Sequence, residues 1–142
     1  MQVDTILQSK GGAVYTVAAH APIADAVEIL NKHRIGAVVV LADSGAVAGI
    51  LSERDVVRHL GDDPAGLLKR AVSEIMTTRV VTCARMTPIA DLMEQMTTHR
   101  IRHIPIVEDG ELVGIVSIGD VVKRKIEETE QEALALREYI AS

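Results

Sequence analysis

Two serine–aspartate pairs with the same spacing are the residues of this chain best suited to contact a ligand. "GILSERD" spans 49–55 and "GIVSIGD" spans 114–120, so in each copy an Asp follows a Ser by three residues. Such a pair can cap a helix, because the Ser hydroxyl accepts from the third amide and the carboxylate favours the positive helix end. A carboxylate at a helix start can also bind the vicinal diol of a ribose beside free N–H groups. The spacing alone fits both interpretations.

The two pairs belong to an internal duplication. With Pro22 aligned to Pro88, "PIADAVEILNKHRIGAVVVLADSGAVAGILSERDVV" matches "PIADLMEQMTTHRIRHIPIVEDGELVGIVSIGDVV" once Ser44 is gapped. The identities include Pro-Ile-Ala-Asp, His-Arg-Ile, Gly-Ile-x-Ser and Asp-Val-Val. Chance does not place so many identities in one register, and duplicated halves usually bury a face of one against the other.

Each half predicts the same elements. A short strand (13–17 or 79–83) precedes a helix with Pro in its first turn, where the missing N–H costs nothing. Two strands joined by a tight turn follow, at Asp43-Ser44-Gly45 or Asp109-Gly110, and a second helix begins near Ser52 or Ser117. The first helices carry apolar faces, formed by Ile23, Ala26, Val27 and Leu30, and by Ile89, Leu92, Met93 and Met96.

The predicted fold class is therefore α/β, with two tandem β-α-β-β-α units that bury a face of one against the other. Unit 1 is expected over 1–70 and unit 2 over 71–142. The charged tail from Lys123 is expected to extend the last helix. The two interpretations of this tail are a solvated helix and a helix that docks a partner, and a mixture is expected in which the incomplete apolar stripe packs locally. The stripe consists of Ile126, Leu134, Leu136 and Ile140.

Composition argues against several function classes. The net charge is −5 and the only aromatic rings of the Phe, Tyr and Trp type are Tyr15 and Tyr139. Nucleic-acid binding is not expected, because it needs positive potential and, for single strands, stacking rings. The longest apolar run, 37–42, is too short to span a membrane, and the start has no apolar signal-peptide core. The lone Cys83 can form no internal disulfide, so a cytoplasmic location is predicted.

Signals for catalysis or metal binding are weak. The chain has no P-loop and no G-x-G-x-x-G. His99 and His103 are four residues apart, but the predicted helix ends between them, so no zinc site is expected. No nucleophile–base pair stands out, and no enzyme activity is predicted.

The residues resemble paired cystathionine-β-synthase (CBS) domains, the Bateman module. The resemblance covers roughly 5–126 and rests on the duplicated units, "HRIGAVVV" and "HRIRHIPIV" before the turns, the two Ser-x-x-Asp pairs, and "IMTTRVVT" before the second unit. It implies that the two units pack as a pseudo-twofold pair with two clefts, which commonly bind AMP, ADP, ATP, NAD(H) or S-adenosylmethionine. It also implies dimerisation and, in many members, regulation of an attached enzyme or channel.

The resemblance implies a nucleotide cleft in the second half. Asp120 is expected to bind the ribose, Ser117 to cap and bind, and Arg102 or His103 to point at phosphate. The alternative for Arg102 is a surface ion pair with Glu108 or Glu111. Other expected contacts with ribose-phosphate, base or adenine edge come from Thr77, Val81, Ile101, Ile104 and Pro105, the last on an edge strand.

The first-half cleft is expected to differ. Asp55 and Ser52 match the second-half pair, but Gly36-Ala37, followed by Val38, replaces Arg102-His103. Phosphate partners there would be Lys10, Arg54 or a group from the other unit, and the alternative for Lys10 and Arg54 is solvent exposure. Tyr15, which matches Val81, is expected to line this cleft or to have a core or rim role. The site would bind a different ligand, bind weakly, or be empty.

The leading hypothesis is a non-catalytic adenine-nucleotide sensor that acts through a regulated partner protein. S-adenosylmethionine is expected to bind poorly, because its positive sulfonium would face Arg102. The alternative is an interaction or scaffold module with a degenerate ligand site, as Gly36-Ala37 suggests. A homodimer is predicted because Leu92, Met93 and Met96 beside Ile89 exceed what one contact can bury.

Overall fold

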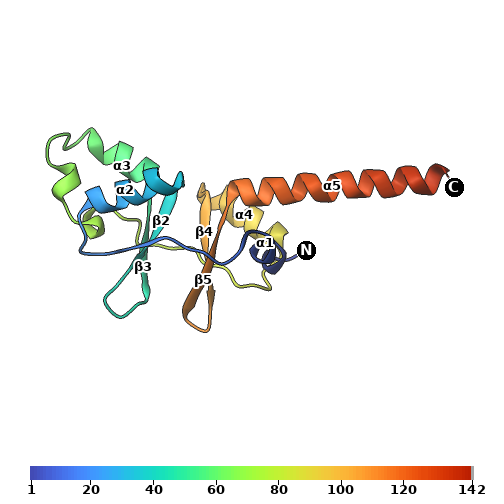
Figure 1. Ribbon diagram of the computed structural model, residues 1–142, viewed down its shortest axis with the longest axis horizontal. Coiled ribbons are helices and arrows are strands. Elements are labelled where there is room, and N and C mark those ends of the chain that lie inside the picture. The colour runs from blue at the N-terminus through green and yellow to red at the C-terminus, as the bar shows by residue number, and fades with distance from the viewer. Residues whose placement is uncertain (142) are drawn as a thin grey trace.

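The computed structural model describes residues 1–141, which form an α/β protein of two side-by-side lobes (Figure 1). The first lobe contains β1 (Thr16–Ala18), α2 (Ile23–His33), β2 (Ala37–Leu41), β3 (Val47–Ser52) and α3 (Glu53–Leu60). The second contains α4 (Ile89–His99), β4 (His103–Glu108), β5 (Glu111–Ser117) and α5 (Ile118–Ala141). The remaining elements are α1 (Val3–Lys10) and two short 3-10 helices, η1 (Leu67–Lys69) and η2 (Val72–Glu74).

The sheets follow the predicted layout in one half and depart from it in the other. In the first lobe β1 pairs parallel to β2, and β2 pairs antiparallel to β3. Among the described residues of the second lobe, β4 and β5 alone form a sheet, so the predicted strand over 79–83 is wrong. Only Cys83 pairs, through its N–H to Pro105 O (3.0 Å) and its O to Val107 N–H (2.9 Å). The segment starts at a bridge between Thr77 and Ile50 of the first lobe, so it crosses between the lobes instead of following one strand.

The turn of the second lobe is the predicted two-residue hairpin. Asp109 and Gly110 have φ of 50° and 79°, and Glu108 pairs with Glu111 across them. Positive φ at both central residues is the requirement of a type I′ turn, which Asp-Gly meets.

The first helix of each lobe buries the same positions. Pro22 and Pro88 are the N-caps of α2 and α4. Ile23, Ala26 and Leu30 are buried in α2, and Ile89, Leu92 and Met96 in α4. Met93, in contrast, is 38% exposed. α4 therefore exposes one large apolar side chain, whereas the sequence predicted several for a dimer contact.

The segment that precedes each repeat packs on the other repeat. Val3, Ile6 and Leu7 of α1 lie in the core of the second lobe, whereas Val72 and Ile75 lie in the core of the first. The same backbone hydrogen bond occurs in both lobes, from Ile23 N–H to Arg70 O (2.8 Å) and from Ile89 N–H to Met1 O (2.9 Å). The two cores therefore do not follow the expected division at residue 70, and the lobes share their chain segments.

Gly49 and Gly114, which open the repeated "GILS" and "GIVS", make this crossing possible. A Cβ added at Gly49 would lie 2.7 Å from Thr77 O, and one at Gly114 would lie 2.6 Å from Leu7 Cδ1. Real Cβ atoms do not approach other atoms so closely, so β3 needs glycine where the backbone of the crossing segment passes, whereas a side chain at Gly114 would require the end of the Leu7 side chain to move.

Gly49→Ala is expected to lower the free energy of unfolding by about 1–3 kcal/mol, because the added methyl group meets the backbone of Thr77. Urea unfolding followed by circular dichroism measures the change. Gly61→Ala is the control, because Gly61 has φ −64° and its nearest neighbour would lie 3.8 Å away. Equal stability of the Gly49 and Gly61 variants would contradict the close approach.

Cys83 is expected to be unreactive in the folded protein. Burial, assisted by the nearby Glu108 carboxylate, raises the pKa of its thiol to about 11. At pH 8 about one thiol in a thousand is then ionised, and the thiolate is the reactive form. A thiol-disulfide reagent should label Cys83 slowly in native protein and quickly in urea; fast native labelling would contradict the prediction.

α5 extends well beyond the lobes (Figure 1). The prediction that the tail continues the last helix is confirmed, since α5 runs for 24 residues. The prediction that its apolar stripe packs locally is wrong: Ile126 and Ile140 are 54% and 74% exposed, and residues 129–141 are all exposed. The body of the second lobe ends before this part of the helix, so no other described segment covers it. None of the helices within residues 1–141 is long and apolar enough to cross a membrane.

Candidate functional site

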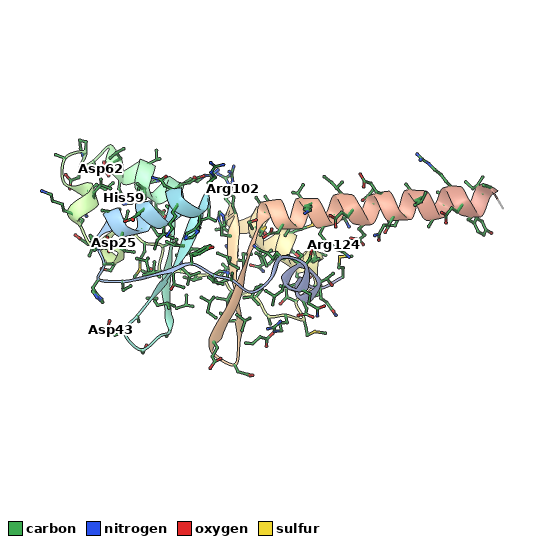
Figure 2. All side chains as sticks on the ribbon, viewed as in Figure 1. Asp25, Asp43, His59, Asp62, Arg102 and Arg124 are labelled. Carbon is green, nitrogen blue, oxygen red and sulfur yellow. The ribbon has the colours of Figure 1, made fainter. Side chains whose placement is uncertain are left out.

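A cavity of about 490 Å³ is lined by residues of both lobes. Figure 2 labels Arg102, one of its lining residues, near the junction of the two lobes. The volume lies in the range of small-molecule sites. Of the predicted site residues, those that line it are Gly36, Ala37, Ser52, Arg54, Asp55, Thr77, Val81, Arg102 and His103.

Asp55 is the buried carboxylate of this cavity, at 9% exposure. Its Oδ2 accepts hydrogen bonds from Ser52 N–H (2.9 Å) and from the Ser52 hydroxyl (3.1 Å), and Asp55 N–H donates to Ser52 Oγ (3.3 Å). This is a complete capping box, so the structural interpretation of Ser-x-x-Asp is confirmed. Among the described residues nothing donates to Oδ1, which leaves that oxygen available to a ligand.

Arginine is the dominant charged residue of the cavity. Five line it, and none of them takes part in an ion pair among residues 1–141. The proposed ion pair of Arg102 with Glu108 or Glu111 is therefore not formed. Guanidinium groups bind phosphate oxygens two at a time, so this wall is suited to an anion. The five are Arg54, Arg58, Arg79, Arg100 and Arg102.

Sequence reasoning missed Arg58, Arg79 and Arg100. Arg58 lies four residues after Arg54, on the same face of α3. Arg79 alternates with Thr77 and Val81 along an extended segment, where every second residue shares a face. These two spacings could have identified Arg58 and Arg79, whereas no spacing in the sequence indicates Arg100.

The expected grouping of Arg102 with Asp120 is wrong. Arg102 lines the cavity of Asp55, and Asp120 and Ser117 do not line it. Asp120 instead pairs with Lys10: Nζ lies 2.7 Å from Asp120 Oδ2 and donates to Ile115 O at 3.0 Å. Lys10 belongs to α1, which packs on the second lobe. Because the leading segments cross, Lys10 lies beside Asp120 and not beside Asp55, and Arg102 lies in the cavity of Asp55.

Lys10 stabilises the charged form of Asp120. Burial by itself raises the pKa of this carboxyl group, but hydrogen bonds from Lys10 and the Ser117 amide, with the charge of Lys10, outweigh burial and hold the pKa below its ordinary 3.8. Ser117 also caps α5, since Asp120 N–H donates to its Oγ at 3.2 Å. The second Ser-x-x-Asp thus caps α5, and its carboxylate is paired with a lysine of the same chain.

Asp120→Asn is expected to lower the free energy of unfolding by about 0.5–1 kcal/mol at pH 7. Because the folded pKa is lowered, the stabilisation by Asp120 exists above the unfolded pKa and is lost as pH falls below 3.8 towards the folded pKa. Urea titrations of both proteins at pH 7 and pH 3 measure this loss. A difference between wild type and variant that stays the same at both pH values would contradict it.

His103 lies between the two aspartate regions. A Cβ at Gly36 would be 3.2 Å from His103 Cε1, so glycine leaves room for the ring from the other lobe. Burial lowers the pKa of His103; Glu53 and Asp120 oppose this, and Lys10 and Arg102 add to it. The ring is therefore neutral at pH 7. The first-half cleft does contain cations, although Gly36-Ala37 contributes none. They come from the second half of the chain, which is one of the alternatives that the sequence left open.

Several predicted site residues lie elsewhere. Val38 and Ile104 are fully buried in the two cores, and Pro105 is buried with its carbonyl bonded to Cys83. Pro105 is thus flanked by β5 and Cys83, not on an open edge. Tyr15 stacks on His33 with ring centroids 3.7 Å apart and does not line the cavity. The apolar residues that do line it include Val81 and Ile101.

No group of three or more His, Cys, Asp or Glu residues in the described range could hold a metal ion. α4 ends at His99 and β4 begins at His103. The prediction that the helix ends between these two histidines is therefore confirmed.

The comparisons with known proteins match both repeats. Residues 12–62 and 72–127 each match the family model described as CBS domain. The chain belongs to the CBS domain family. It is 34% identical over 146 residues to CBS domain-containing protein CBSX3, mitochondrial, of Arabidopsis thaliana, covering 97% of this chain and 71% of that protein. The CBS-domain containing protein ATU1752 of Agrobacterium tumefaciens has a TM-score of 0.84 at 44% identity, covering 87% of this chain and 92% of that chain.

Two related structures contain adenosine ligands. CBS domain protein PAE2072 of Pyrobaculum aerophilum is a complex with AMP, with 27% identity, a TM-score of 0.76, and coverage of 84% of this chain and 89% of that one. The CBS domain pair of protein MJ0100 is a complex with 5-methylthioadenosine and S-adenosyl-L-methionine, with 27% identity, a TM-score of 0.79, and coverage of 90% and 98%. The pairing of two CBS units and the α/β fold predicted from the sequence are thereby confirmed.

Proposed function

We propose that this CBS pair binds an adenine nucleotide, AMP, ADP, ATP or NAD(H), in the cavity of Asp55 and is a non-catalytic sensor. The observation that carries the proposal is the set of five arginines around one buried, capped aspartate, none of which forms an ion pair with a carboxylate of residues 1–141. A ligand with a diol and at least one phosphate satisfies both features. The AMP complex of PAE2072 supports the same ligand class.

Each feature of the cavity has a role in this proposal. Asp55 Oδ1 accepts from a ribose hydroxyl, while Oδ2 stays in the cap. Arginines such as Arg79 and Arg102 hold the phosphate. Val81 and Ile101 provide the aliphatic surfaces for adenine, in place of an aromatic ring.

Occupancy would be reported to a regulated partner protein. The cavity uses residues of both lobes, so a ligand in it contacts both and restricts how they move relative to one another. The cytoplasmic location stays a prediction, since the relative CBSX3 is described as mitochondrial. The homodimer also stays a prediction.

The Lys10–Asp120 pair favours a second candidate role for the other aspartate region. There the lysine already satisfies the carboxylate, as a ligand would, which fits a scaffold function for that half of the molecule.

Calorimetry with AMP, ATP and NADH, and mass spectrometry of small molecules released from purified protein, test the proposal. We expect one adenine nucleotide per chain. Absence of binding by all three, together with no released nucleotide, would favour the scaffold alternative for the whole module.

A further inference from the structure

The exposed side of α5 carries a heptad pattern. Counting along the helix, the positions that alternate by four and three residues are Val122, Ile126, Thr129, Ala133, Leu136 and Ile140. This is the a/d repeat of a coiled coil, with Ile126, Ala133 and Ile140 at a. The seam spans about 27 Å at 1.5 Å per residue.

The seam faces away from the protein's own body. Val121 is buried and Arg124 contacts Met1, so these residues mark the side of α5 that packs on the second lobe. Val122 and Ile126 are 48% and 54% exposed, and Leu136 is 59% exposed. The seam thus begins on the lobe and continues along the projecting half of the helix, with large apolar residues at its two ends and Thr129 and Ala133 between them.

The charges that flank the seam select the orientation of a partner. In a parallel pair of identical helices, each g residue faces the e residue five positions later on its partner. Here Lys125 faces Glu130, and Glu132 faces Arg137, so both pairs are attractive.

An antiparallel pair has the opposite charge pattern. In the antiparallel register that fills every seam layer, Lys123 would face Arg137, and Glu130 would face the same glutamate of its partner. These contacts are between like charges and would disfavour that arrangement.

We propose that a second copy of this chain covers the seam, and that the two α5 helices form a parallel two-stranded coiled coil. The pairing places the two second lobes side by side at the start of the coiled coil. Thr129 and Ala133 contribute small layers, so the helix pair is short of apolar contact at its centre and acts together with the exposed apolar residues at the start of α5.

The first test uses two leucines that differ only in heptad position. Leu136 is in the seam, whereas Leu134 is outside it and is almost equally exposed, 56% against 59%. Sedimentation should show that Leu136→Asp raises the dimer dissociation constant by about tenfold or more, because a carboxylate enters the seam, and that Leu134→Asp does not. Equal effects of the two variants, or a wild-type protein that is monomeric at micromolar concentration, would overturn the proposal.

The second test separates the orientations. In a parallel pair Leu136 faces its own counterpart, whereas in the antiparallel register it faces Ile126. Leu136→Cys should form a disulfide-linked dimer on mild oxidation, and Leu134→Cys should not. The native Cys83 interferes little, because its thiol pKa is about 11. Failure of Leu136→Cys to cross-link, with efficient cross-linking of a mixture with Ile126→Cys, would overturn the parallel orientation.

A charge exchange completes the design. Lys125→Glu and Glu130→Lys each place like charges across the pair and should weaken the dimer, while the double variant restores attraction and should regain wild-type affinity. Lys125 lies 3.8 Å from Glu128 of its own helix, so helix content of each variant is checked by circular dichroism. If the free energy of dimerisation that the double variant loses equals the sum of the losses in the two single variants, the proposed contacts between g and e residues are contradicted.

Discussion

Asp55→Asn is expected to weaken AMP binding about thirtyfold or more, while Asp120→Asn leaves it nearly unchanged. Loss of a charged acceptor for the ribose costs about 2 kcal/mol or more, which corresponds to this factor. The two variants are matched, because each aspartate caps a helix through the serine three residues before it. Only Asp55 lines the arginine-rich cavity.

Calorimetric titration of AMP into the three proteins decides between the two aspartates. Thermal unfolding is measured in parallel, so that a loss of cap energy is not mistaken for a loss of ligand contacts. A weaker affinity in Asp120→Asn with wild-type affinity in Asp55→Asn would place the ribose in the other half of the molecule and contradict the proposed site.

Removing the phosphate from the ligand is expected to have a comparably large effect: adenosine should bind about a hundredfold more weakly than AMP. Two charge-assisted contacts at about 1.5 kcal/mol each account for this factor. The cavity offers arginines such as Arg79 and Arg102 for these contacts. S-adenosylmethionine, with a positive sulfonium near the same groups, should also bind poorly.

The matching variants are Arg102→Ala and Lys32→Ala. Both remove one positive charge, but Lys32 lies exposed on α2 and outside the cavity. Arg102→Ala should narrow the difference between AMP and adenosine, and Lys32→Ala should not. An unchanged ranking of AMP, adenosine and S-adenosylmethionine in Arg102→Ala would rule out a phosphate contact of that residue.

The elements were predictable because the duplication and the local signals agree. Pro22 and Pro88 before apolar helical faces, Asp109-Gly110 between strands, and Ser-x-x-Asp before helices each determine local structure, and all three signals were correct. These local sequence patterns do not indicate which half of the molecule a crossing segment packs against. The pairing of Thr77 with Ile50 and the packing of α1 on the second lobe are tertiary contacts, and they moved Arg102 from Asp120 to Asp55.

The faces of the central strands were also beyond sequence reasoning. Ala37–Val40 and Ile104–Ile106 are buried at every position, so side chains on both faces of these strands are covered. A strand buried on both faces lacks alternation between polar and apolar residues, so its sequence does not say which side chains face a cavity. The resemblance to CBS domains places Val38 and Ile104 in the clefts, whereas both side chains lie in the cores.

The exchange of leading segments between the two lobes bears on how such a chain could arise. A single repeat with this packing would lack Val3, Ile6 and Leu7, or Val72 and Ile75, from its core unless a second copy supplied them. It would therefore be complete only as a segment-swapped dimer, whose assembly depends on protein concentration. Joining two repeats in one polypeptide makes the exchange intramolecular, with a high effective concentration set by the linker. After the duplication, the folding of each core no longer depends on protein concentration. The two halves can then diverge, as they do at Gly36-Ala37 and the equivalent Arg102-His103.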